Sequence, residues 1–248
     1  MARQIHVGKR SDFQSKDLWD MHRLRTRVFK DRMGWEIPIL SGMEIDGYDA
    51  IEPYYMMIRS ETGSVCGCWR VLPTDGPYML KDTFPQLLYG KPAPETKSVW
   101  ELSRFAIETE APHGFGFAEM ALDAMREIVI FGDRMGITHY ATVTTTAIER
   151  MLRRTGIAIT RYGPPMRIGV ENAVAIDIDI GAQTHMSLFG HFGKPAAPSE
   201  RTYWLLRIRS RPVAPIDETL RQKIPAPSCM VGYLRVGSNS ARIRRVSP

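Results

Sequence analysis

Cysteine is scarce in this chain of 248 residues, and this scarcity excludes several kinds of site. The three cysteines, Cys66, Cys68 and Cys229, cannot form a disulfide framework. Cys66 and Cys68 stand two residues apart without the further Cys or clustered His that a zinc site requires. We therefore expect no metal site.

Long apolar runs are also absent. The start of the chain, MARQIHVGKR, lacks the apolar core of a signal peptide, and no window approaches the roughly 20 apolar residues that cross a bilayer. With 44% hydrophobic residues, the chain can still bury a sizeable core. We expect a globular, cytoplasmic protein without a membrane span.

The net charge of +6 is spread unevenly along the chain. Residues 194–248 hold 11 Lys or Arg against 3 Asp or Glu, whereas residues 1–193 hold 22 against 24. The same end holds 7 of the 17 prolines, which favours weak order, although two short apolar runs within it point the other way. We predict one domain over 1–193 and a basic, Pro-rich C-terminal extension over 194–248.

Helix and strand signals alternate along the first part of the chain. Apolar residues at steps of three and four predict helices at 17–33, 117–131 and 147–155. Runs of β-branched or alternating residues predict strands at 54–59, 65–72, 99–107, 138–145 and 173–180. This order predicts a mixed α/β sandwich, in which helices cover a sheet.

The first predicted helix carries a cation and an aromatic residue on one face. Arg25 and Phe29 are one turn apart in LRTRVFKDRMGW, and Trp35 follows where the helix ends. Each residue taken singly has a simpler interpretation, with Phe29 and Trp35 in the core and Arg25 in solvent.

The strand 99–107 places charges inside an apolar run, WELSRF. Strand alternation puts Glu101, Ser103 and Phe105 on one face, and Leu102 and Arg104 on the other. A buried charge is costly without a partner. The structural alternative therefore pairs Arg104 with the acid at 46 or 49, and Glu101 with a nearby arginine.

A third segment, MEIDGYDAIEPYY, carries four carboxylates among aromatic and aliphatic residues. Acids beside aromatic faces suit a positively charged ligand. The segment therefore raises the question of which positive group these acids bind.

Together these segments resemble the LuxI-type acyl-homoserine lactone synthases, a family of autoinducer synthases. The resemblance rests on signature positions within LRTRVF, GW, EIDGYD, CWR and WELSRF: Arg25, Phe29, Trp35, Asp46, Asp49, Arg70, Glu101 and Arg104. The phrases GPYMLK, TFPQLL and WELSRFAI make the chain most similar to the LasI-type branch, which makes long-chain 3-oxoacyl signals. The resemblance covers about residues 3–192 and does not include the extension.

The resemblance implies a fold like that of the GCN5-related N-acetyltransferases, a three-layer α/β/α sandwich whose mixed sheet has splayed central strands. It implies two substrates, S-adenosylmethionine and an acylated acyl carrier protein, and no cofactor. The acyl chain would pass to the amine of S-adenosylmethionine, and lactonisation would then release methylthioadenosine. The product would be a quorum-sensing autoinducer.

The resemblance also assigns site residues. S-adenosylmethionine would be bound by Arg25, Phe29, Trp35, Asp46 and Arg104. Asp46 and Asp49 would serve partly to orient this positively charged ligand and partly to hold the arginines of the pocket, whereas Glu44 and Glu52 are expected to face solvent. Catalysis would involve Glu101, Arg104, Arg70 and Asp49. Glu101 is our choice for the general base that takes a proton from the amine, and Arg70 is expected to organise the ion pairs.

An apolar slot is needed for the acyl chain. Its candidate residues come from several predicted elements: Trp69, Met79, Phe84, Leu102, Ser103, Phe105, Leu122, Met125, Thr142, Val143, Thr144, Leu152 and Ile157. Most are core residues under any interpretation. Thr144 matches the threonine associated with 3-oxo preference and could donate a hydrogen bond to the β-keto oxygen. Chain length should respond to volume at Met79, Leu122 or Met125.

Two segments are candidates for contacting the carrier. Arg150, Arg153 and Arg154 in IERMLRRTG share one side of a short helix and would complement an acidic carrier protein, whereas the alternative is a solvated basic face. The glycines of PHGFG, at 112–116, precede a helix whose backbone N–H groups could bind the pantetheine phosphate, or they form a simple turn.

Two rival functions remain. A GNAT-type acyl-CoA N-acyltransferase acting on another amine would share the fold, but it leaves the grouping of Arg25, Phe29, Trp35 and Asp46 unexplained. A nucleic-acid binder would use the basic extension and ignore the rest of the chain. We expect no nucleic-acid partner.

Overall fold

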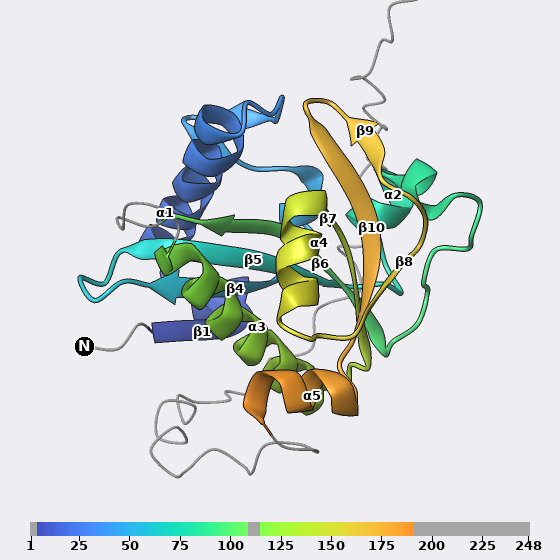
Figure 1. Ribbon diagram of the computed structural model, residues 1–248. Helices are drawn as coiled ribbons and strands as arrows, with labels where there is room; N and C mark the ends of the chain where they lie inside the picture. Colours follow the sequence, from blue (N-terminus) through green and yellow to red (C-terminus); the bar gives the residue numbers. More distant parts are fainter. Residues whose placement is uncertain (1–3, 109–114, 191–248) are drawn as a thin grey trace, which may run out of the picture. The chain divides into compact units, whose positions relative to one another are not determined.

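The computed structural model describes residues 4–108 and 115–190. Its main sheet has eight strands in the order β1-β4-β5-β6-β7-β10-β8, with β9 paired to β10 (Figure 1). The strands of this sheet are β1 (Gln4–Lys9), β4 (Tyr54–Arg59), β5 (Val65–Pro73), β6 (Val99–Ile107), β7 (His139–Thr145), β8 (Ile159–Arg161), β9 (Met166–Ile168) and β10 (Glu171–Asp179). A separate two-stranded ribbon joins β2 (Ile39–Leu40) to β3 (Met43–Glu44).

Five α-helices and several single turns connect the strands in the described ranges. The α-helices are α1 (Ser15–Arg25), α2 (Met79–Asp82), α3 (Phe115–Met135), α4 (Thr146–Arg154) and α5 (Ala182–Phe189). A π-helical segment, Thr26–Arg32, continues α1, and 3-10 turns occupy Arg10–Asp12, Gly47–Asp49 and Pro85–Leu88. The predicted helices and strands are confirmed to within a few residues, except that the first predicted helix changes to a π-helix at Thr26.

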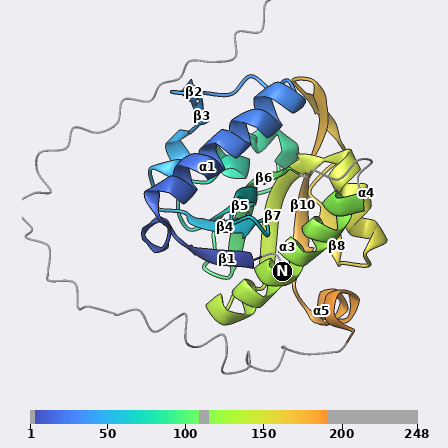
Figure 2. The same cartoon turned by 90° about the vertical axis from the view of Figure 1, so that its left-hand side faces the viewer.

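Helices cover both faces of the main sheet, which confirms the predicted three-layer α/β/α sandwich (Figures 1 and 2). On one face, α1 buries Met21 and Leu24 against β4 and β5. On the other face, α3 buries a stripe at steps of three and four residues, including Ala124, Met125 and Ile128. Helices α4 and α5 add Leu152 and Leu188 to this second cluster.

The sheet is mixed and its two central strands separate. β6 and β7 run parallel, and their pairing extends only from Val99 opposite His139 to Leu102 opposite Thr142. Both strands continue beyond this point, to Ile107 and Thr145. The predicted splay of the central strands is therefore confirmed, and it opens the sheet between β6 and β7.

A β-bulge sits at the point where β6 leaves β7. Ser103 lies opposite Arg70, but Ala106 lies opposite Cys68, so β6 has one residue more than β5 in this interval. Arg104 takes up the extra residue with a φ of 58°, in the left-handed region that non-glycine residues rarely occupy.

This bulge overturns one expectation about the faces of β6. Strand alternation had placed Phe105 with Ser103, and Arg104 with Leu102. Instead, Arg104 contacts carboxylates on the α1 side, as Ser103 contacts Arg70, whereas Phe105 packs on Trp69 with its ring centroid at 4.5 Å. The physical reason is that a bulge residue breaks the two-residue period of a strand.

Gly132 allows α3 to approach the sheet closely. A Cβ atom on Gly132 would lie 2.6 Å from Ile180 Cδ1 and 2.9 Å from Tyr140 Oη. Tyr140 is fully buried and its hydroxyl donates to the carbonyl oxygen of Ile128 at 2.8 Å, so its ring is fixed. Helix and sheet can therefore hold this spacing only with glycine at position 132.

We predict that Gly132→Ala lowers the free energy of unfolding by about 1–3 kcal/mol, because overpacking outweighs the higher helix propensity of alanine. Urea unfolding measures the change. Gly76→Ala is the matched control, since nothing lies within 4 Å of a Cβ at that position. Equal unfolding midpoints for the two variants would show that α3 can move away from the sheet without loss of stability.

Candidate active site

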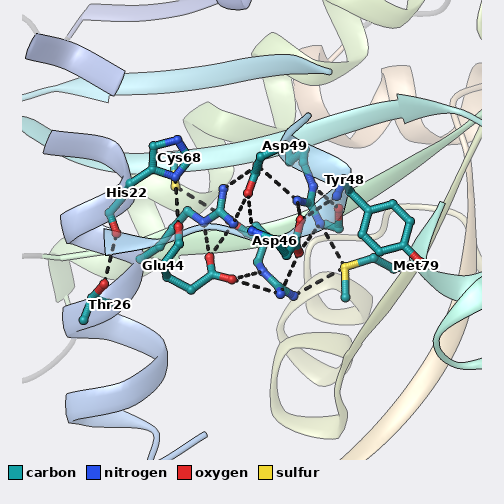
Figure 3. Close-up of polar contacts among 12 residues, drawn as sticks. His22, Thr26, Glu44, Asp46, Tyr48, Asp49, Cys68 and Met79 are labelled. Atoms are coloured by element: carbon teal, nitrogen blue, oxygen red, sulfur yellow. Dashed lines mark hydrogen bonds and ion pairs between the residues drawn. The ribbon is translucent and has the colours of Figure 1, made fainter. Parts of the chain in front are cut away.

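Three arginines from three elements converge with three carboxylates inside the protein (Figure 3). The arginines are Arg25 at the end of α1, Arg70 on β5 and Arg104 on the β6 bulge. The carboxylates belong to the segment 44–49: Glu44, Asp46 and Asp49. We call these six side chains the ion network. Its formal charge sums to zero, which makes the burial of so many charged groups tolerable.

Arg25 is fully buried and has two carboxylate partners. Its Nη1 and Nη2 donate to the two oxygens of Asp49, each at 2.9 Å, and its Nε donates to Glu44. Tyr55 also donates to Asp49, at 2.9 Å. Burial alone would raise the pKa of Asp49, but the charge and hydrogen bonds of Arg25, followed by the charge of Arg70, hold that pKa far below its usual range.

Arg70 and Arg104 share the remaining acceptors. Arg70 donates to Asp46 Oδ2 at 3.0 Å, to Asp49 Oδ1 at 3.1 Å and, through Nε, to Ser103 Oγ at 3.1 Å. Arg104 donates through Nε to Glu44 at 3.1 Å, and its Nη2 lies 2.8 Å from Asp46 Oδ2. The expected pairing of Arg104 with the acid at 46 is present, and each arginine of the network bridges two of its three carboxylates.

Local backbone geometry aims the two aspartates at the arginines. Asp46 caps the 3-10 turn Gly47–Asp49, and its side chain accepts from the backbone N–H of Tyr48 at 2.9 Å. Asp49 returns the contact by accepting from the backbone N–H of Asp46 at 2.9 Å. This reciprocal capping box fixes both carboxylates before any ligand binds.

One expectation about the acidic segment is wrong. Glu44 was expected to face solvent, yet it is fully buried between Arg25 and Arg104. The strand pairing of β2 with β3 turns Glu44 inward, and this short ribbon has no clear sequence signal. Glu52 is exposed, as expected.

The aromatic pair of the first helix lies beside the network. Phe29 stacks on Trp35 with ring centroids 5.1 Å apart and planes 5° apart. The guanidinium carbon of Arg104 lies 5.8 Å from the centroid of Phe29. Arg25 and Phe29 are both buried, so the interpretation of Arg25 as a solvated residue is wrong.

Glu101 is buried next to the network without belonging to it. Its carboxylate accepts from the backbone N–H groups of Met79 at 3.0 Å and Leu80 at 2.7 Å, at the start of α2. The alternative that pairs Glu101 with an arginine through a salt bridge is therefore wrong. Burial raises the pKa of Glu101 to about 7, although its two backbone hydrogen bonds act in the opposite direction.

Met79 does not lie where it was expected. It was assigned to the acyl slot, but its Sδ atom accepts from Arg70 Nη2 at 3.0 Å and from Arg104 Nη1 at 3.4 Å. The carboxylate of Glu101 holds the first turn of α2 and so directs Met79 towards the two arginines.

A cavity opens where β6 and β7 separate. It is lined by twelve residues: Trp69, Ser103, Arg104, Phe105, Ala121, Met125, Thr142, Val143, Thr144, Ile148, Met151 and Leu152. Eight of these were expected in an acyl slot. Ala121, Ile148 and Met151 were missed, because helix periodicity identifies a buried stripe without showing which part of it borders a gap.

Five expected slot residues do not line this cavity. Leu102 and Ile157 are buried in the main core cluster, and Leu122 packs against it. Phe84 belongs to a separate cluster beneath α2, and Met79 contacts the ion network. Their apolar character predicted burial correctly but could not distinguish core from cavity.

The arginines of α4 lie on its exposed side. Arg150, Arg153 and Arg154 are exposed, as the basic-face interpretation requires. Arg153 pairs with the buried Glu149, which also binds Arg161 from β8. Sequence reasoning missed Arg161, because it lies 12 residues from Glu149 and on a different element.

Some expectations fall outside the described ranges. PHGFG at 112–116 lies largely outside them, and residues 194–248 lie wholly outside them. Within 4–108 and 115–190, no helix is both long and apolar enough to cross a membrane. Across the same ranges, no three His, Cys, Asp or Glu side chains are grouped to hold a metal ion, and the absence of metal chemistry stays a prediction.

Comparison with known proteins identifies the family. Residues 9–188 match the family model described as autoinducer synthase. This chain belongs to the autoinducer synthase family. Its relatives include an acyl-homoserine-lactone synthase of Pseudomonas aeruginosa, 47% identical over 188 residues that cover 75% of this chain and 94% of the relative.

Solved structures of autoinducer synthases agree with this assignment. The AHL synthase LasI is 45% identical and superposes with a TM-score of 0.75, covering 79% of this chain and 99% of LasI. The CoA-dependent acyl-homoserine lactone synthase BjaI, solved with SAM and isopentyl-CoA, is 25% identical with a TM-score of 0.69, covering 79% of this chain and 92% of BjaI. The chain is thus an enzyme of the acyl-homoserine-lactone synthase class, and its resemblance to the LasI-type branch is confirmed.

Glu44, which is buried in the ion network, and Glu52, which is exposed, provide a matched test of the network. Glu44→Gln should lower the free energy of unfolding by about 3–5 kcal/mol, because it leaves Arg25 and Arg104 buried with one carboxylate fewer. Glu52→Gln, at an exposed position, should change it by less than about 0.5 kcal/mol. Chemical unfolding measures both variants. Equal stabilities would contradict the neutralising role of Glu44.

Proposed function

We propose that this protein transfers a long-chain 3-oxoacyl group from acyl carrier protein to S-adenosylmethionine and then closes the lactone. The observation that carries the proposal is the junction of two unlike sites. Ser103 and Arg104 line the apolar cavity. Arg104 also belongs to the ion network, and Ser103 accepts a hydrogen bond from Arg70 of the same network. A polar, charged ligand and an apolar chain can therefore meet at one end of the cavity.

S-adenosylmethionine fits the network side by its charges. Its sulfonium and α-amino groups are positive, and its carboxylate is negative. Asp46 is the least buried carboxylate of the network, with 11% of its side chain exposed, and Phe29 and Trp35 offer aromatic faces nearby. Arg104, also 11% exposed, is the arginine best placed to bind the substrate carboxylate. Arg25 and Asp49 then act by supporting these two groups.

The first reaction step is an acyl transfer. The α-amine, once neutral, attacks the thioester carbonyl, a C–N bond forms, the C–S bond breaks, and the carrier thiol leaves with a proton. Glu101 is our candidate for the base that accepts the proton of the amine, because its pKa of about 7 suits proton transfer near neutral pH. Glu101 lies two residues from Ser103 on the network face of β6, so this transfer would run through the Ser103 hydroxyl or a water molecule.

The second step closes the ring. The carboxylate of the methionine part attacks its own γ-carbon, the C–O bond forms, and the C–S bond to the sulfonium breaks to release methylthioadenosine. The sulfonium is already a good leaving group, so the protein contributes mainly by positioning. Arg104 would hold the carboxylate for this displacement.

The cavity supports an acyl chain with a 3-oxo group. Its lining includes three hydroxyl-bearing residues, Thr142, Thr144 and Ser103, together with apolar residues such as Met125, Met151 and Leu152. A hydrogen bond from Thr144 to a β-keto oxygen would contribute about 0.5–1.5 kcal/mol, a preference of about twofold to tenfold over unsubstituted chains. The candidates for setting chain length are now Ala121, Met125 and Met151, because these residues line the cavity and Met79 and Leu122 do not.

The acyl donor is proposed to be a carrier protein rather than coenzyme A. The relative BjaI is described as CoA-dependent, so coenzyme A is the alternative donor. The exposed arginines of α4 favour an acidic protein partner, because the inner side of the same helix lines the cavity through Ile148, Met151 and Leu152.

A product assay with the purified full chain tests the proposal. S-adenosylmethionine is supplied with 3-oxoacyl and unsubstituted long-chain donors, each on carrier protein and on coenzyme A. Mass spectrometry should find equal amounts of N-acyl-homoserine lactone and methylthioadenosine, with carrier-bound 3-oxo donors giving the higher kcat/KM. Lactone formation from coenzyme A alone would overturn the donor assignment, and no lactone from any donor would overturn the function.

The role of Glu101 predicts a pH profile. If its carboxylate takes the proton of the amine, kcat should fall about tenfold for each pH unit below about 7 and level off above it, because only the ionised form can act. Glu101→Gln should abolish turnover across the whole range while circular dichroism shows a retained fold. The range from pH 5.5 to 8.5 extends about one and a half pH units to either side of the Glu101 pKa. A wild-type kcat that stays constant over this range would show that Glu101 is not the base.

A further inference from the structure

Helix α4 contains a buried acid that the proposed reaction does not use. The side chain of Glu149 has no exposed surface, and arginines occupy both of its oxygens. Oε1 accepts from Arg153 Nε at 3.0 Å and from Arg161 Nε at 2.6 Å. Oε2 accepts from Arg161 Nη2 at 2.6 Å. One carboxylate therefore holds two guanidinium groups, and it holds Arg161 by two hydrogen bonds.

The two arginines reach Glu149 from different elements. Arg153 is one helical turn further along α4, and Arg161 ends β8, after the chain reverses at Gly156. Their side chains are 47% and 39% exposed, so each guanidinium is fixed on one side and open to solvent on the other. The hydrogen bonds of Glu149 to Arg161 and Arg153 also keep the pKa of Glu149 below its usual value, so the acid stays charged at neutral pH.

The neighbouring arginines differ from these two. Arg150 and Arg154 are exposed, and in the described part of the chain neither has a carboxylate partner. Within the described residues, the face thus combines two arginines that lack a carboxylate partner with two that Glu149 holds. Four arginines and one glutamate leave a net charge of +3 on this face.

A purely structural tie between α4 and β8 would need only one arginine. Glu149 instead binds two arginines, Arg153 and Arg161, and both side chains remain partly exposed. The opposite side of α4 lines the acyl cavity. A fixed guanidinium loses less side-chain freedom on binding an anion than a mobile one, and its planar fork matches a carboxylate. These features suit recognition of an acidic protein surface.

We propose that Glu149 is a positioning residue of the donor-docking face, and that it presents Arg153 and Arg161 to carboxylates of an acidic acyl carrier protein. This inference rests on the proposed function, because it assumes that the donor docks at α4. It adds Arg161 to the docking face and assigns a role to an acid within a basic surface.

The sign of one substitution separates positioning from net charge. Glu149→Gln makes the face more positive, so net charge alone would lower the KM for an acidic carrier protein. Positioning predicts the opposite: the KM for acylated carrier protein should rise about threefold to tenfold, because Arg153 and Arg161 lose their fixed orientation. The KM for S-adenosylmethionine and kcat should stay within about twofold, because that substrate binds at the ion network.

A charge-conserving variant covers the case in which Glu149→Gln folds poorly. Arg161→Lys keeps the charge but cannot form the two-pronged contact, so it should raise the KM for carrier protein in the same way. Arg167→Lys is the matched control, since Arg167 is an exposed strand arginine outside the docking face, and its kinetics should match those of the wild type.

The outcomes separate this inference from the proposed function. An unchanged or lowered KM for carrier protein in Glu149→Gln and Arg161→Lys overturns the positioning role, as does an equal rise in the KM for S-adenosylmethionine. The double charge reversal Arg150→Glu with Arg154→Glu tests docking itself. If it raises the KM and the two positioning variants do not, only this inference fails. If it also has no effect, the docking face fails as well.

Discussion

Three guanidinium groups lie inside this fold, and a buried charge is stable only when opposite charges and hydrogen bonds compensate it. The acidic segment 44–49 supplies this compensation, one carboxylate for each arginine. Because the compensation is mutual, α1, β5 and β6 are joined to a short segment with little regular structure of its own. The network is therefore a structural element as well as the wall of the proposed substrate site.

The β6 bulge connects this network to the cavity. Without the extra residue, strand alternation would direct Arg104 towards α3 and away from the carboxylates. Because of the bulge, Arg104 contacts the ion network, as Ser103 does, and Phe105 packs against Trp69 in the cavity wall. It occurs where β6 leaves β7, so this local irregularity brings a charged group to the opening of the sheet. The left-handed backbone at Arg104 is the strain that this arrangement requires.

The sequence predicted the fold class and most elements. Apolar residues at steps of three and four indicate the buried side of a helix, and runs of β-branched residues indicate strands. It also predicted which residue types form the site. It could not predict that Glu44 turns inward, since a two-residue strand leaves no period to read. It could not separate Met79 from the cavity-lining Met125, since an apolar side chain that borders a gap looks like one in the core. Arg161 was missed because its partner Glu149 lies on another element.

The central claim is that one end of the cavity joins an ionic site to an apolar one. A crystal structure of the full chain with S-adenosylmethionine and a non-reactive acyl-pantetheine analogue tests it most directly. We expect the sulfonium ligand beside Asp46 and Arg104, the acyl chain between β6 and β7, and the amine within reach of the thioester carbon near Ser103. Ligands bound at separate places, or an acyl chain outside the cavity, would contradict it.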